Sequence, residues 1–365
     1  MSKLLERYYL AAMLKEPDQV PVVIYCSEPT YVAFCGERLL ELYKDPAKML
    51  ACQLRFIERF PNALHGHFTL WPRMSGPGDG FPTAFGAELE WAEGSSPVTK
   101  PVIRDPNEID SLEVPDPWRD GRLPYQLEAL KYYVEHAPVK VREHYGLLDN
   151  QVYCPGGVEY AALLMGYDKF LLGFYRYPEK IHKLIRIVTD SAIEFAKAQE
   201  EIVGKATKVF ISDHSATFMS RKHFLEFAFP ELKRIAETFK GALIVYHNEG
   251  DIRHILDLIP EMGVDIFHFG SPIDVAEAKR KIGDKVCLMG NIPSIEVMLK
   301  GDPEIVESVC RRAILDGAAG GGFILSVSGG LVPHTPAENI DAMIRSAEKY
   351  GKYPIKNVKT LTPKP

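Results

Sequence analysis

KVFIS (208–212) and ALIVYH (242–247) open a series of apolar runs that decides the fold, and VDIFHF (264–269), KVCLMG (285–290) and GFILSV (322–327) complete it. Each run is almost continuously apolar and is bounded by Gly, Asp or Pro, which indicates a strand buried on both faces. Helical patterns separate the runs, at Ser220 to Phe239, Asp251 to Met262, Val275 to Ile282 and Pro303 to Leu315. Strands that alternate with helices in this way predict a parallel sheet.

The first half of the chain supplies three more strand patterns, VPVVIY around 21–25, ALHGHF at 63–68 and QVYCP at 151–155. Eight such units predict the α/β class and a (β/α)8 (TIM) barrel, and we expect residues 1–365 to form one domain of this kind. A long insertion rich in Pro and Gly, about 70–150, lies between strands two and three. We expect it to contain short strands and a helix from Tyr125 to His136, and to fold over the barrel mouth.

The composition excludes several classes of protein. The chain is 46% hydrophobic and 25% charged, with a formal net charge of -6, so a nucleic-acid surface is not expected. None of the six cysteines forms a CxxC pair, which favours reduced thiols in a cytoplasmic protein. The chain shows no signal peptide and no apolar run near the ~20 residues that a membrane span needs, so no membrane association is expected.

Polar residues gather where the predicted strands end, and barrel enzymes place their chemistry at the carboxyl ends of the strands. Asp213 and His214 follow the fourth strand. Six of the eleven histidines belong to this set, namely His65, His67, His214, His247, His268 and His334. Imidazole with carboxylate favours metal binding or acid–base catalysis, although any single histidine could equally be a hydrogen-bonded core residue.

The motif HNEGD at 247–251 lies at a strand-to-helix turn. His247 and Glu249 are two residues apart, so an extended turn would point both toward the mouth. The alternative is that Glu249 or Asp251 only caps the next helix.

Several longer stretches resemble the uroporphyrinogen decarboxylase-like superfamily. They are KEPDQVPV (15–22), VPDPWRDGRLPYQLEAL (114–130), HNEGDI (247–252), DVAEAKRKIGDKVCLMGNI (274–292), GGGFIL (320–325) and LVPHTPAENIDAMIRSAEKYG (331–351). The resemblance is most specific from Asp213 to Gly351. The superfamily includes the decarboxylase of haem synthesis and methyltransferases that exchange methyl groups with a corrinoid (cobalamin) protein, among them relatives that demethylate methoxylated aromatics.

Two branches of the superfamily fit this sequence less well. Its decarboxylases carry an arginine-rich segment at strand one, where this chain has VPVVIYCSEPTY without arginine. Its coenzyme M methyltransferases bind zinc through His-x-Cys and a later Cys, where this chain has His247, Glu249 and Gly329. The resemblance therefore favours the O-demethylase branch, in which a methyl ether would give its methyl group to the Co(I) of a separate corrinoid protein.

From this comparison we expect a zinc ion held by His247, Glu249 and Glu226, which would bind the ether oxygen as a Lewis acid. Asp213, His214 and His67 are the candidate catalytic residues, with Asp213 as a third ligand or an acid–base group. The candidate substrate-binding residues are Tyr25, His65, Trp71, Cys154, His268 and Asn291. An aromatic wall for the substrate is expected from Tyr25, Phe68, Trp71, Phe81 and Phe85.

The expected partners are a small methyl donor and a corrinoid-binding protein, and we also expect a homodimer. Two other functions stay open at this point. One is a decarboxylase or related lyase without metal, acting by general acid catalysis on a smaller acid. The other is a barrel without catalytic activity that binds a ligand or partner, because fold alone does not establish function.

Overall fold

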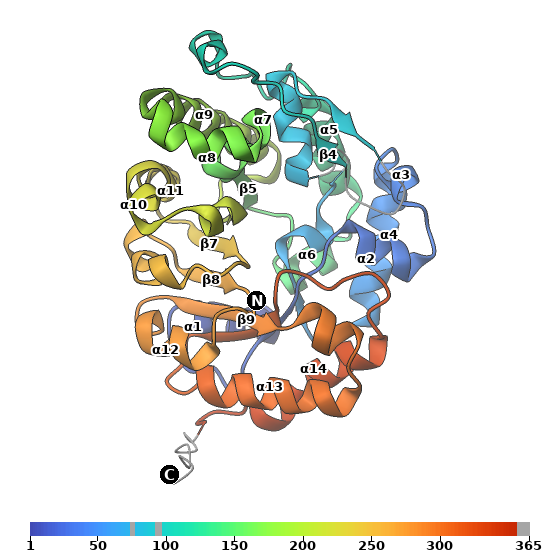
Figure 1. The fold of residues 1–365 in the computed structure, drawn as a ribbon. Helices are drawn as coiled ribbons and strands as arrows, with labels where there is room; N and C mark the ends of the chain where they lie inside the picture. The colour runs from blue at the N-terminus through green and yellow to red at the C-terminus, as the bar shows by residue number, and fades with distance from the viewer. Residues whose placement is uncertain (74–76, 92–96, 356–365) are drawn as a thin grey trace.

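The computed structural model describes residues 1–73, 77–91 and 97–355, and its centre is one curled sheet of eight parallel strands (Figure 1). The strands pair in the order β2, β1, β10, β9, β8, β7, β6, β5. Their bounds are β1 Val22–Ile24, β2 Leu64–His65, β5 Gln151–Pro155, β6 Lys208–Ser212, β7 Leu243–Asn248, β8 Ile266–Phe269, β9 Cys287–Ile292 and β10 Phe323–Val327. The predicted (β/α)8 architecture is confirmed.

Helices lie outside the strands, as Figure 1 shows for α9, α11, α12 and α13. The α-helices are α1 Lys3–Ala12, α2 Glu28–Cys35, α3 Leu39–Leu42, α4 Pro46–Arg59, α5 Leu123–His136, α6 Val139–Tyr145, α7 Gly157–Met165, α8 Tyr167–Arg176, α9 Pro178–Val203, α10 Arg221–His223, α11 Phe229–Thr238, α12 Val275–Ile282, α13 Pro303–Gly317 and α14 Ala337–Tyr350. Shorter 3-10 segments are η1 His67–Leu70, η2 Pro77–Phe85, η3 Pro106–Ser111, η4 His214–Phe218, η6 Arg253–Leu258 and η7 Pro260–Met262, and two π-helical turns are η5 Phe224–Ala228 and η8 Ser294–Leu299.

Two predicted helices are interrupted, each just before a proline. The segment 220–239 divides into α10, the π-helical turn η5 and α11, with Pro230 in the first turn of α11. The segment 251–262 forms two 3-10 turns that meet at Pro260. Proline lacks the N–H that a continuous helix needs and clashes with the preceding turn, so both breaks have the same cause.

The sheet has an open side between β2 and β5, because within the described ranges no hydrogen-bonded ladder joins these two strands. Side chains fill the gap, with the rings of Phe68 and Tyr153 centred 5.2 Å apart. The insertion covers the same side: its helix α5 packs against both α4 and α9, and its short strands β3 (Leu89–Glu90) and β4 (Val98–Thr99) pair antiparallel. The helix expected at 125–136 is confirmed, but it supports the side of the barrel rather than covering the mouth.

Helix α1 closes the amino-terminal end of the barrel. Leu5 and Tyr8 of α1 line a small internal space of about 30 Å³ together with His65, His67 and Lys208. Alternation along a strand sends every second side chain inward, so Lys208, Phe210 and Ser212 of β6 point into the barrel, while Asp213 points toward the helices. No helix in the described part of the chain is long and apolar enough to cross a membrane.

Candidate active site

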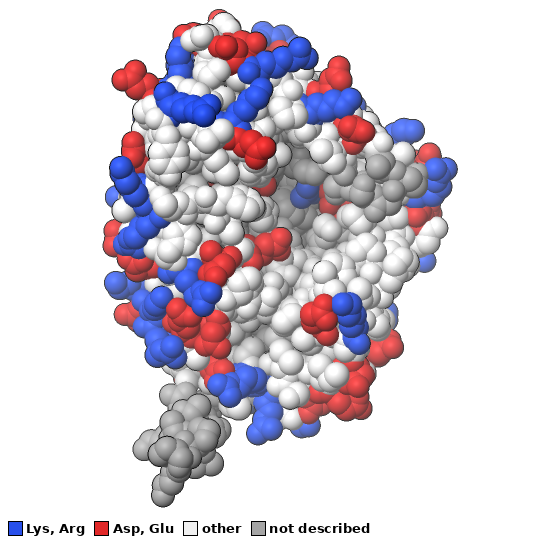
Figure 2. Space-filling view, in the orientation of Figure 1, with Lys and Arg blue, Asp and Glu red and all other residues white. Residues whose placement is uncertain are grey.

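A cavity of about 580 Å³ opens at the carboxyl ends of the strands. Tyr25, His247 and Glu249 line it, together with loop residues that follow β8, β9 and β10. Figure 2 shows this face of the molecule hollowed near its centre. A volume of several hundred Å³ is that of a pocket for a small molecule. The mouth of the barrel therefore offers one defined binding site.

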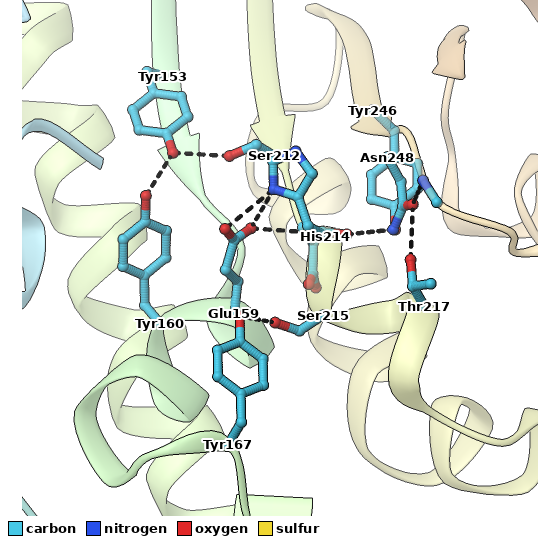
Figure 3. Close-up of polar contacts among 12 residues, drawn as sticks. Tyr153, Glu159, Tyr160, Tyr167, Ser212, His214, Ser215, Thr217, Tyr246 and Asn248 are labelled. Carbon is cyan, nitrogen blue, oxygen red and sulfur yellow. Dashed lines mark hydrogen bonds and ion pairs between the residues drawn. The ribbon is translucent and has the colours of Figure 1, made fainter. Parts of the chain in front are cut away.

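His214 and Glu159 form an ion pair beside this cavity (Figure 3). Glu159 of α7 accepts hydrogen bonds from the backbone N–H of His214 at 2.9 Å and from its Nδ1 at 3.0 Å. Burial alone would lower the pKa of His214, but the Glu159 carboxylate outweighs burial and raises that pKa to about 9. His214 is thus an imidazolium at neutral pH, with its Nε2–H available.

His247 has the opposite protonation state. His268 Nε2 lies 2.9 Å from the carbonyl oxygen of Val327, which can only accept, so this nitrogen carries the proton of His268. His268 Nδ1 is then an acceptor, and His247 Nδ1, 2.9 Å away, must donate to it. Burial, and then the neighbouring imidazoles, hold the pKa of His247 well below its usual range. His247 is therefore neutral, and its Nε2 presents a lone pair.

The two imidazoles are neighbours, with ring centroids 5.0 Å apart in an edge-to-face arrangement. Tyr25 stacks on His247, with centroids 5.3 Å apart. Its ring fits there because residue 66 is glycine: a Cβ at Gly66 would lie 2.4 Å from the Tyr25 ring. A proton donor and a proton acceptor with pKa values shifted in opposite directions are the usual arrangement of an acid–base site.

Asp213 lies next to the site but does not point into it. Its backbone N–H donates to the His247 carbonyl oxygen at 3.2 Å, while its carboxyl group packs against Gly156 on the helix side. Burial, reinforced by the Glu159 carboxylate, raises the pKa of Asp213 to about 8. The predicted role of Asp213 as a ligand beside His247 is therefore wrong, because its carboxyl group faces away from His247.

Two of the predicted histidines lie below the mouth. His67 is buried, and its ring centroid lies 5.3 Å from that of Phe210, on which it stacks, and 4.6 Å from that of Trp71. Burial holds the pKa of His67 well below its usual range. His65 Nε2 lies 3.2 Å from the carbonyl oxygen of Phe60, and burial lowers the pKa of His65 to about 3. Both line the small internal space and not the mouth cavity, so their placement is that of core histidines.

The remaining predicted residues separate into two groups. Tyr25 lines the cavity and His268 supports His247 directly behind it. Trp71 is fully buried, Cys154 faces the helix layer near Arg234, and Asn291 donates from Nδ2 to the carbonyl oxygens of Gly270 and Ile273. These three have structural surroundings, and the assignment of Cys154 to substrate is corrected because strand alternation directs it outward.

The predicted aromatic wall is only partly present. The Phe68 ring packs edge-to-face against Tyr25, with ring centroids 6.2 Å apart, and lies in the barrel interior. Phe81 packs on Tyr160 and Phe195 in the layer outside the strands, and Phe85 packs on Phe81. His334 is also separate, since it lines a small surface pocket with Phe34. Tyr25 is thus the aromatic side chain of the predicted wall that lines the mouth cavity.

The predicted zinc ligands do not form a metal site. Glu226 lies in η5 on the outside of the barrel, 42% exposed, with its Oε1 3.8 Å from Nε2 of His182 on α9. It cannot join His247 and Glu249 at the mouth. Across residues 1–73, 77–91 and 97–355, no group of three or more His, Cys, Asp or Glu side chains is arranged to hold a metal ion. A structural or catalytic zinc site needs at least three such ligands, so the residues present do not fit zinc.

Sequence reasoning missed Glu159, which controls the charge of His214. It lies in the first turn of α7, after Gly156 and Gly157, and no motif marked it. The available signal was its place: it follows β5 by four residues, so it also lies at the carboxyl end of a strand.

Comparisons with known proteins identify the family. The family model described as "Uroporphyrinogen decarboxylase (URO-D)" matches residues 4–350. The chain belongs to the URO-D family. Among URO-D family relatives, a "Uroporphyrinogen decarboxylase" of Dechloromonas aromatica is 26% identical over 94% of this chain and 97% of its own length. A "Methylated-thiol--coenzyme M methyltransferase" of Methanosarcina mazei is 28% identical over 72% of this chain and 68% of its own.

The fold of the URO-D family also appears in a solved structure. A "methyltransferase from Methanosarcina mazei" superposes with a TM-score of 0.78, covering 96% of this chain and 99% of that chain at 22% identity. This likeness shows the fold. Both a decarboxylase and a methyltransferase thus occur among the relatives, so the two functions have to be distinguished by the residues of the site.

Proposed function

We propose that this chain is a methyltransferase that takes a methyl group from a methyl ether, a methoxylated aromatic, and gives it to the cobalt of a separate corrinoid protein. The observation that carries the proposal is the pair of imidazoles at the mouth: His214, held as a cation by Glu159, beside neutral His247 under the Tyr25 ring. The methyltransferase relative supports the same direction.

His214 supplies the group that this reaction needs. When the methyl carbon leaves, the C–O bond breaks and its electron pair stays on the oxygen, which becomes an alkoxide or phenoxide. Glu159 holds Nδ1 of His214, so Nε2–H is the remaining proton donor, and it neutralises the departing oxygen. Proton donation replaces the Lewis acid that the sequence predicted, because the side chains present do not fit zinc.

Tyr25 and His247 orient the substrate. The Tyr25 ring gives the cavity an apolar wall against which an aromatic substrate can pack. His247 Nε2, fixed as an acceptor by the chain through His268 to Val327, can take a hydrogen bond from the substrate. Both side chains line the same cavity.

A corrinoid, when bound, supplies the nucleophilic metal that receives the methyl group. The cavity has the volume of a small-molecule pocket, so it can hold the methyl donor but not the macrocycle as well. The residues therefore fit a corrinoid carried by a partner protein at the mouth, with Tyr25 and His247 holding the donor below it.

Uroporphyrinogen decarboxylation is the rival function, because relatives of similar identity carry that name. A substrate with many carboxylates calls for a basic pocket. No Lys or Arg side chain is among the described residues that line the mouth cavity, and Arg73, which stacks on Phe68, is in an ion pair with Glu28 at 2.7 Å. The charge of the cavity favours methyl transfer.

The test is methyl transfer from a panel of methoxylated aromatics to reduced corrinoid, followed by the absorbance of the corrinoid and by release of the phenol. We expect turnover, and a loss of about 10²- to 10⁴-fold in His214→Ala, the usual contribution of a general acid. Glu128→Gln, an exposed ion-paired glutamate on α5, is the control and should keep full activity. Release of CO2 from a porphyrinogen, with no methyl transfer from any donor, would overturn the proposal.

A further inference from the structure

The carboxylate of Glu249 occupies the space that a side chain at position 329 would need. A Cβ built on Gly329 would lie 1.6 Å from Glu249 Oε2. Gly329 also has a φ of +68°, a backbone conformation that strains any other residue. These two positions, in the loops that follow β7 and β10, are therefore coupled: glycine at 329 leaves the space that the Glu249 carboxylate occupies.

Other glycines hold the backbone of the same turn close to its neighbours. A Cβ on Gly270 would lie 1.9 Å from the carbonyl oxygen of Glu249, and a Cβ on Gly250 would lie 2.0 Å from Oγ1 of Thr217. Asn248 adds a hydrogen bond of 2.9 Å from the Gly250 N–H to its Oδ1. The turn that carries Glu249 is thus packed in place, although the Glu249 side chain itself is exposed to the cavity.

Glu249 is the carboxylate of this site whose charge has no ion-pair partner among the described residues. Glu159 is paired with His214, and Glu296, on the cavity rim, is paired with Lys300 at 2.8 Å. No Lys or Arg among the described residues lines the cavity. The charges of these ion pairs cancel, so Glu249 leaves one net negative charge at the site, which acts on the His214 cation without a close ion pair.

His247 provides a second, independent sign of a ligand. It is 4% exposed, it lines the same cavity, and within the described structure its Nε2 has no hydrogen-bond partner. This nitrogen faces the cavity as an acceptor that the protein leaves free, so a ligand N–H or O–H can donate to it. The Tyr25 ring, which stacks on His247, lines the same cavity.

We infer that the natural methyl donor carries a positively charged ammonium group, which Glu249 binds, and that aromatic ethers with a carboxylate are disfavoured. This inference rests on the proposed function for the methyl ether, and it adds the charge of the rest of the molecule. The ammonium N–H groups donate to Glu249, and the rest of the molecule lies in the cavity that Tyr25 and His247 line. A carboxylate in the same place would face Glu249, and the neighbouring cation His214 is already paired with Glu159.

The experiment measures binding without any corrinoid, so it is independent of methyl transfer. Titration calorimetry at pH 7 compares three matched ligands, 4-methoxybenzylamine, 4-methoxybenzyl alcohol and 4-methoxybenzoate. We expect affinity to fall in that order, with a ratio of at least about tenfold between the amine and the benzoate, as one close charge pair in a half-exposed site predicts. Glu249→Gln should reduce the ratio to about threefold or less, while Glu128→Gln leaves it unchanged.

Gly329→Ala is the second variant, since its methyl group would displace the carboxylate without removing the charge from the chain. It should lose the preference for the amine as Glu249→Gln does, and a thermal melt shows that the fold is kept. Tighter binding of the benzoate, no binding of any of the three, or an undiminished ratio between the amine and the benzoate in Glu249→Gln would overturn the inference. If the order holds but no donor is demethylated, the proposed function fails and the ligand class stands.

Discussion

Glu159→Gln tests the link between the ion pair and the chemistry, because it removes the charge of Glu159 and keeps its shape. Glu159 provides the two largest contributions that raise the pKa of His214 to about 9. Without them, burial opposes the smaller effects of Glu249 and Asp213, so the pKa of His214 should return to its ordinary value of 6.5 or below. The proposed acid would then lose its proton in the neutral range.

The size of the effect follows from these two values. At pH 8 a group with a pKa of about 9 is ~90% protonated, whereas one with a pKa of 6.5 is ~3% protonated. If His214 must be cationic, kcat/KM at pH 8 should fall about thirtyfold in Glu159→Gln, and much less at pH 6. The direction is that of an acid: activity is present below the pKa and is lost as the pH rises through it.

The assay is kcat/KM for methyl transfer from pH 6 to pH 10, with the His214 ring titrated directly by NMR in the same samples. The wild type should lose activity near pH 9 and the variant near pH 6.5 or below. Glu128→Gln, whose carboxylate lies on α5 and pairs with Lys131, should follow the wild-type profile. An alkaline limb that stays in place in Glu159→Gln, although NMR shows a lowered pKa of His214, would refute its role as the acid.

Two further predictions concern residues that the sequence suggested as catalytic. The wild type should lose stability relative to Asp213→Asn as the pH rises from about 4 to 8, by several kcal/mol at pH 8. The reason is that the pKa of Asp213 is about 8 in the folded state and 3.8 in the unfolded state, so ionising the buried acid becomes increasingly costly to the fold. Urea unfolding of both proteins at pH 4.5 and pH 8 measures this, and a difference that does not change with pH would contradict it. His67→Phe should keep kcat/KM and leave the free energy of unfolding unchanged or about 1 kcal/mol higher, because neither ring nitrogen has a hydrogen-bond partner among the residues described. A hundredfold loss of kcat/KM at unchanged stability would show that His67 is catalytic.

The barrel could be predicted from the sequence because its signal is local. A parallel strand covered on both sides must be apolar on both faces, and each run in the second half carried that pattern within about two residues of its observed bounds. The helix Val275–Ile282 was also predicted at its observed bounds, because the signal for its start is local. The side chain of Asp274, the N-cap residue, accepts a hydrogen bond from the Glu277 N–H at 2.9 Å.

The direction of each side chain could not be predicted in the same way. In β5 the sequence offered Cys154 as the chemical residue, yet Tyr153 points inward and bonds Ser212 Oγ at 2.8 Å, while Cys154 faces the helices. A strand that is apolar on both faces hides which face is inside, and one residue of register reverses the assignment. The prediction of Glu226 as a zinc ligand was wrong for a related reason, since a position after β6 in the sequence does not show that η5 lies on the outside of the barrel.

His214 and His247 show why residue type alone underdetermines a site. They are the same residue type at the carboxyl ends of the neighbouring strands β6 and β7, and their ring centroids are 5.0 Å apart. His214 is a cation because a carboxylate from α7 reaches it, whereas burial keeps His247 neutral. The carbonyl oxygen of Val327, three strands away from His247, fixes the proton of His268 and through it the proton of His247. Their different roles are set by partners distant in sequence, so the acid and the acceptor could be told apart only once the chain was folded.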